Sequence, residues 1–144
     1  MAGTFDAYRI DAYTDFTESV VAENSLVVEA GDAVRVDPAT GFVALSWVGE
    51  RIDWISQTLK TFTATNETVE KQSVLFRPNM ANYTYKVEVS GGLLTQANIY
   101  QYFQLTAGQL VDFATASATT GVVQLVEILG DGSFGVFRVT KQGL

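Results

Sequence analysis

The side chains that most often carry enzyme chemistry are missing from this chain or stand in unfavourable patterns. Its 144 residues include no histidine and no cysteine, which removes the commonest general base and metal ligand and every thiolate nucleophile. Two pairs of carboxylates, Glu50 with Asp53 and Glu67 with Glu70, would suit the acid and base of a glycosidase. Carboxylates so close in sequence usually share one solvated face, so we predict no catalytic residue and no enzymatic activity.

A short acidic segment, Asp131-Gly132-Ser133, matches the beginning of a calcium-binding loop. Such a loop needs further oxygen ligands at alternating positions, and none follow. A hairpin turn explains these residues better. Ser90-Gly91-Gly92 also lacks the flanking pattern of a phosphate-binding loop. The sequence therefore predicts neither a metal site nor a cofactor.

Aromatic side chains offer binding chemistry in two places, the first of which lies in the second half of the chain. Tyr100 and Tyr102 stand among amide side chains, and alternation along a strand would put both rings on one face. Two exposed rings suit a protein interface or a sugar platform, whereas in the alternative they fill the core. We treat Tyr100 and Tyr102 as candidate partner-interface residues.

The second aromatic group lies near the N-terminus, where Phe5, Tyr8, Tyr13 and Phe16 alternate with acidic residues. Residues 1–26 show no sustained hydrophobic period, which favours an extended N-terminal arm. Aromatic anchors on such an arm would dock onto a partner and become ordered on contact. In the alternative, this segment packs back on its own barrel. The four aromatic residues complete our set of candidate interface residues.

Turn signals at short intervals, between runs rich in Val, Thr, Tyr and Phe, predict an all-β domain over residues 27–144. The clearest hairpins are 33–47, with Pro38 and Gly41 at its turn, and 122–140. Weaker strands are expected at 60–65, 71–76, 83–89 and 99–105. About eight short strands suffice for a single small β-barrel or β-sandwich.

One segment carries a different period. Val48, Ile52, Ile55 and Leu59 recur at the spacing of a short amphipathic helix near residues 48–59. The β-branched residues and the neighbouring Trp54 also allow a strand there, so both alternatives stay open.

Charge is distributed unevenly along the chain. The formal net charge is −7, and residues 1–37 contribute six of these negative charges, with eight acids against Arg9 and Arg35. Between Glu88 and Glu127 the only charged residue is Asp112. A surface with so little charge is expected to be covered in part, by the core or by another chain.

Composition also limits the partners. The nine basic residues are scattered, whereas a phosphate backbone requires clustered Lys and Arg, so we expect no nucleic-acid partner. No apolar run approaches the roughly 18 residues of a membrane span, and the N-terminus has no secretion-signal pattern. We expect synthesis in a cytoplasm and no membrane partner.

The order of several motifs resembles a family of phage head proteins. These motifs are Gly31-Asp32-Ala33-Val34, the 61–69 stretch, the 71–78 strand, the 87–92 turn and the closing 121–139 hairpin. Over about residues 27–140 they resemble the decoration, or cement, proteins on the outside of tailed-phage capsids. The resemblance includes no catalytic or ligand signature.

The resemblance implies a non-enzymatic virion protein on the outer capsid surface. It would bind the major capsid protein, associate with itself as a trimer or dimer, and stabilise the shell through its N-terminal arm and a neutral β surface. It brings no cofactor. Two alternatives remain: another virion part, such as a head-fibre base, tail or baseplate subunit, or a carbohydrate-binding β module.

Overall fold

The computed structural model describes residues 4–10, 16–20, 26–41, 43–46, 50–56, 60–61, 72–78 and 83–140. These residues contain thirteen strands and one short 3-10 helix, η1 (Gln96–Asn98). The predicted all-β class is therefore confirmed. No helix in this part of the chain has the length and apolar character needed to cross a membrane.

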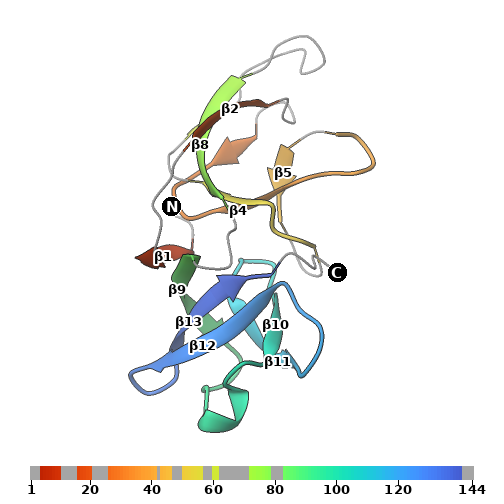
Figure 1. Cartoon of the computed structure of the whole chain (residues 1–144). Coiled ribbons are helices and arrows are strands. Elements are labelled where there is room, and N and C mark those ends of the chain that lie inside the picture. Colours follow the sequence, from red (N-terminus) through yellow and green to blue (C-terminus); the bar gives the residue numbers. More distant parts are fainter. Residues whose placement is uncertain are drawn as a thin grey trace.

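Five strands of the second half close into a barrel. They are β9 (Tyr83–Ser90), β10 (Tyr102–Leu105), β11 (Val111–Ser117), β12 (Val123–Leu129) and β13 (Phe134–Val139). Their order is β9-β11-β10-β12-β13, and β13 pairs again with β9, which closes the ring (Figure 1). Closure depends on a short parallel contact in which Val89 faces Val111 and Ser90 faces Asp112. Because the ring is closed, its strands leave no open edge between them.

The barrel is filled by one set of alternating side chains. Leu125 lies opposite Phe137, and Phe137 lies opposite Tyr85. Phe103 packs edge-to-face against Phe137, with ring centroids 5.9 Å apart. All four side chains are buried, so the residues between them along each strand must face outward.

A second sheet lies beside the barrel (Figure 1). Its order is β2 (Phe16–Val20), β8 (Gln72–Pro78), β6 (Trp54–Ser56), β4 (Ala33–Val36) and β5 (Val43–Leu45). A separate pair consists of β3 (Val27–Val28) and β7 (Lys60–Thr61). Ala33, Ile52 and Ile55 belong to the same buried cluster as the barrel interior, so the second sheet and the barrel share one core.

Both predicted hairpins are confirmed. In the first, Arg35 faces Ala44, Gly41 has a φ of 77°, and the Asp37 carboxylate accepts a hydrogen bond from the Ala39 N–H (2.9 Å). In the second, Leu129 faces Phe134. Local turn chemistry was sufficient to place these two units. Strand β11, in contrast, was not among the predicted strands.

The expected extended arm over residues 1–26 is corrected where the structure describes it. β1 (Asp6–Ile10) pairs antiparallel with β9, and β2 pairs antiparallel with β8. The physical reason is that β8 has an edge free for β2, and that β11 reaches β9 only at Val89 and Ser90, which leaves the backbone of 83–86 on that side to pair with β1. β1 therefore follows the alternative, in which the segment packs back on its own barrel, whereas β2 joins the second sheet.

The helix near residues 48–59 is wrong for residues 50–56. Trp54 faces Val34 of β4 and Pro78 of β8, so β6 receives backbone partners on both sides. Ile52 and Ile55 are both buried in the shared core, which explains the helix-like spacing without a helix. Val48 and Leu59 lie outside the described residues.

Candidate interaction surface

A continuous row of side chains crosses the outside of the barrel. Tyr102 lies opposite Gln124, Gln124 opposite Arg138, and Arg138 opposite Thr84. Directly opposed residues of neighbouring strands point to the same face of a sheet. Since the adjacent Phe103 is buried inside the barrel, this row faces outward.

Hydrogen bonds fix the middle of the row. Arg138 Nε donates to Gln124 Oε1 (2.8 Å), and Gln124 Nε2 donates to the carbonyl oxygen of Tyr100 (3.0 Å). The amide orientation of Gln124 is therefore set on both sides. Gln124 thus bonds the backbone of Tyr100 and lies opposite Tyr102, so both predicted residues adjoin it.

The position of Tyr100 is set differently from the prediction of strand alternation. Tyr100 precedes strand β10 and has a φ of 66°, in the left-handed region. Strand alternation therefore cannot place it beside Tyr102. Its N–H donates to the Leu125 carbonyl (2.8 Å), so backbone pairing with β12 holds Tyr100 in position.

The turn before Tyr100 is itself well bonded. Asn98 Oδ1 accepts from the Thr95 N–H (2.9 Å), and Asn98 Nδ2 donates to Gln101 Oε1 (2.9 Å). Tyr100 nevertheless remains 60% exposed. A left-handed conformation costs a non-glycine residue roughly 1–2 kcal/mol, and such strain often marks a functional position.

Tyr8 reaches the same side of the barrel from another strand. It sits where the β1–β9 register shifts, between Ala7 and Arg9, and it is 40% exposed. Its hydroxyl donates to Glu127 Oε2 (3.4 Å) on β12. Strands β9 and β13 lie between β1 and β12 in the sheet, so Tyr8 extends across both of them.

A second row of outward-facing residues lies at the Tyr8–Glu127 contact. Lys86 faces Val136, and Val136 faces Glu127. Val136 is fully buried although it points outward, which shows that the side chains above it cover it. The Lys86 ammonium also lies 4.8 Å from the centre of the Phe134 ring, within cation–π range.

We call this surface the outer tyrosine face. It consists of Tyr8, Tyr100, Tyr102, Gln124, Glu127 and Arg138. Three of the six predicted interface residues thus converge around two side chains of β12. The face carries both a cation and an anion and no one-sided charge, which suits a polar, near-neutral protein contact.

Of the other three predicted interface residues, only Phe5 is described with its side chain. Phe5 is only 4% exposed and packs edge-to-face on Tyr85, with centroids 5.8 Å apart, so it is a core residue. Phe16 belongs to β2, where its backbone lies opposite Phe76. The side chain of Phe16 and all of Tyr13 lie outside the described residues.

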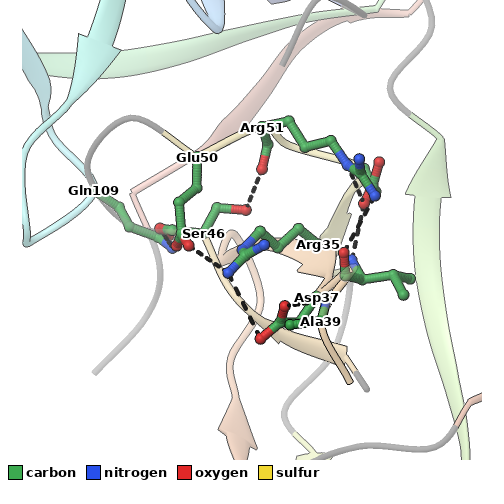
Figure 2. A network of polar contacts seen from close by, with 9 residues as sticks. Arg35, Asp37, Ala39, Ser46, Glu50, Arg51 and Gln109 are labelled. Atoms are coloured by element: carbon green, nitrogen blue, oxygen red, sulfur yellow. Dashed lines mark hydrogen bonds and ion pairs between the residues drawn. The ribbon is translucent and has the colours of Figure 1, made fainter. Parts of the chain in front are cut away.

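A second polar cluster lies on the sheet that contains β4 and β5 (Figure 2). Arg35 forms ion pairs with Glu50 and Asp37, and Arg51 Nε lies 3.1 Å from Asp53 Oδ2. Glu50 and Asp53, the carboxylates that would suit a glycosidase, therefore form ion pairs with different arginines, Arg35 and Arg51. Glu67 and Glu70 lie outside the described residues.

The Arg51–Asp53 pair has a clear structural task. Asp53 Oδ2 accepts from the Val36 N–H (2.8 Å), and Arg51 Nη2 donates to the Val36 carbonyl (3.2 Å). These side chains satisfy the backbone of β4 beyond the point where β6 pairs with it. Such a cluster supports the sheet and offers no pair of carboxylates poised for catalysis.

Asp131 also has a structural role. Its Oδ1 accepts from the Ser133 hydroxyl (2.7 Å) and the Ser133 N–H (3.0 Å), and these bonds lower the pKa of the carboxyl. Gly130 and Gly132 on either side have positive φ, as the turn of a hairpin requires. In the part of the chain that the structure describes, no three His, Cys, Asp or Glu side chains are grouped to hold a metal ion.

Sequence reasoning did not select three residues of the outer tyrosine face: Gln124, Glu127 and Arg138. Polar side chains on a strand carry no local signal of which neighbours the strand pairing will give them. No protein-family model matches the chain, and no curated protein matches it. The function must be argued from the outer tyrosine face itself.

Proposed function

We propose that the protein is a non-enzymatic virion structural protein that decorates the outer surface of a tailed-phage capsid. It binds the shell through its outer tyrosine face and stabilises it. Its partners are the major capsid protein and further copies of itself, in a dimer or trimer. It acts on the assembled virion after synthesis in the host cytoplasm.

The observation that carries this proposal is the placement of Tyr100. Tyr100, a residue that is 60% exposed, has a strained backbone that is held by bonds to Leu125 and Gln124. Tyrosine is enriched among the residues that dominate binding energy, because it buries a large area while losing few rotamers. A fixed, exposed tyrosine is thus a suitable anchor for a protein partner.

The surroundings of this anchor support the same function. Tyr8 and Tyr102 add aromatic area on either side of β12, and Gln124 and Arg138 add hydrogen-bonding groups. Charged residues are scarce between Glu88 and Glu127, as expected for a surface that a neighbour covers. Binding repeated on a symmetric shell lets modest contacts combine through avidity.

The proposed attachment to the shell does not use a free N-terminal arm. Residues 6–10 and 16–20 are engaged as strands, and Phe5 is in the core. The proposed attachment therefore rests on a folded surface, which needs little ordering when it binds.

Co-sedimentation with empty shells tests the proposal. Shells are assembled from the major capsid protein encoded with this chain, in compact and expanded forms. We expect saturable binding at a fixed ratio per capsomer, and we expect Tyr100→Gly to weaken it by roughly tenfold or more. Tyr100→Gly suits this purpose because glycine accepts the left-handed backbone.

A matched control is Leu93→Ala, which truncates another exposed apolar side chain outside the outer tyrosine face. Leu93→Ala should bind shells as the unchanged protein does. Equal losses in both variants would remove the outer tyrosine face from the proposal. No binding to either form of the shell would favour a tail, baseplate or fibre subunit instead.

A carbohydrate-binding module is the second candidate. Tyr100 is largely exposed, and its carbonyl oxygen accepts a hydrogen bond from the Gln124 amide, whose oxygen accepts one from the Arg138 guanidinium. An exposed aromatic ring and planar polar groups on one face also suit a sugar. Titration with a glycan panel, followed by tyrosine and tryptophan fluorescence, tests this candidate. A saturable signal that Tyr100→Gly abolishes would favour it over shell binding.

A further inference from the structure

We infer that the side-chain amide of Gln109 is a latch that couples the closed barrel to the second sheet. We further infer that the second sheet separates from the barrel as a unit when the latch opens. This inference does not depend on the proposed function. It rests on the hydrogen bonds between one barrel turn and the hairpin of β4 and β5.

Gln109 lies in the turn between β10 and β11, yet its side chain points into the second sheet. It is only 4% exposed. Its Oε1 accepts from the Ala33 N–H (2.9 Å), and its Nε2 donates to the Ala33 carbonyl (2.8 Å) and the Ser46 carbonyl (2.7 Å). Figure 2 shows the side chain reaching Ser46 beside the charged cluster.

These bonds interrupt an ordinary strand ladder. Val34 faces Leu45, so the next pair along the hairpin is Ala33 with Ser46. A hydrogen-bonded antiparallel pair exchanges two N–H to O=C bonds. Here the Ser46 N–H does donate to the Ala33 carbonyl (2.9 Å). The reciprocal partners, the Ala33 N–H and the Ser46 carbonyl, are both occupied by the Gln109 amide.

The turn that carries Gln109 is built to present it. The Thr106 N–H donates to the Leu110 carbonyl (2.7 Å), and Thr106 Oγ1 accepts from the N–H groups of Gly108 and Leu110 (both 3.2 Å). Thr4 Oγ1 donates to the Gln109 carbonyl (2.6 Å). The φ of Gln109 is 63°, which is strained for a residue with a side chain.

The same groups can therefore adopt two satisfied arrangements. With the amide inserted, the hairpin is bonded to the barrel. With the amide withdrawn, the Ala33 N–H and Ser46 carbonyl can bond to each other and complete the ladder. An element with two discrete, internally bonded arrangements is what a conformational switch requires.

Other contacts also join the barrel to the second sheet. The Phe5 N–H donates to the Gly31 carbonyl (3.0 Å), and apolar contact is made by Ala33, Ile52 and Ile55. Apolar contacts are non-directional. The three hydrogen bonds of the Gln109 amide give the contact with the hairpin a defined direction.

Hydrogen exchange of the full-length chain, read by mass spectrometry or NMR, tests the latch. Gln109→Gly removes the amide and accepts the left-handed backbone, and Gln109→Leu removes the amide while retaining most of the volume. In both variants we expect amides of β4 and β6 to exchange roughly ten- to a hundredfold faster, since a buried bonding group is lost. Amides of β9, β12 and β13 should keep their rates.

Gln96→Ala, which truncates an exposed glutamine of η1, is the control and should leave both sets of amides unchanged. Equal acceleration in the barrel and the second sheet would overturn the inference, because the two would then open as one unit. Unchanged rates in both Gln109 variants would overturn it as well, because the amide would then not couple the two parts.

Discussion

Gln124 Nε2 lies 3.0 Å from the carbonyl oxygen of Tyr100, on the outside of the barrel. The bond joins an exposed aromatic residue to the row that runs from Tyr102 to Arg138. It also stabilises a backbone conformation that tyrosine rarely adopts. The backbone that carries this exposed ring is thereby held in place before any partner arrives, which lowers the ordering cost of association.

Tyr100→Gly should leave the stability unchanged or raise the free energy of unfolding by up to about 1 kcal/mol. Relief of the left-handed strain opposes the greater freedom of glycine in the unfolded chain. Urea unfolding measures the difference. A loss of more than about 1 kcal/mol would show that the ring supports the fold, contrary to an interface role.

Phe5→Ala should lower the free energy of unfolding by about 3–5 kcal/mol, because it empties a ring site in the core beside Tyr85. Leu93→Ala is the control, since Leu93 is exposed, and should stay within about 0.5 kcal/mol of the parent. Thermal and urea unfolding both report these changes. Similar small effects in the two variants would mean that the segment before β1 contributes little to the core.

Two glycines of one turn should respond differently to alanine. A Cβ at Gly132 would lie 2.5 Å from the Leu94 carbonyl oxygen, and the φ is +95°. Gly132→Ala should therefore cost about 3 kcal/mol, combining backbone strain with a clash. Gly130→Ala, with no atom within 4 Å of its Cβ, should cost about 1 kcal/mol. Equal losses of unfolding free energy in the two variants would contradict this, because the clash at Gly132 would then add nothing to the backbone strain.

The pH dependence of stability should carry opposite contributions from two aspartates. Burial raises the pKa of Asp32, despite the hydrogen bond that its Oδ2 accepts from the Glu29 N–H (2.8 Å). The folded state then holds this proton more tightly than the unfolded state, so Asp32 contributes less stability as the pH rises through its folded pKa. Asp131 has a lowered pKa, and its contribution is lost as the pH falls.

Asp32→Asn should therefore be more stable than the parent near about pH 7, and the gain should shrink as the pH falls toward 4. The amide keeps an oxygen that can accept from the Glu29 N–H. Urea unfolding at several pH values measures this trend. A gain that stays constant across the pH range would show that ionisation of Asp32 is not its cause.

Sequence and tertiary structure contributed differently to the candidate site. Tyr8, Tyr100 and Tyr102 were selected from the sequence because aromatic residues in a charge-poor or acidic setting favour interfaces. Phe5 was selected on the same basis and lies in the core. Residue type predicts that a ring will be buried somewhere, and only the strand register decides whether its own core or a partner can cover it.

The sequence by itself determined the all-β class and the hairpins at 33–47 and 122–140, because Pro38, Gly41, Gly130 and Gly132 act within a few residues. Only the tertiary structure decided the strand at Trp54–Ser56, the closure through Val89 and Val111, and the insertion of Gln109 between Ala33 and Ser46. These features depend on backbone groups from distant parts of the chain satisfying one another. No local pattern encodes such pairing, since each partner is chosen by what the rest of the fold brings within reach.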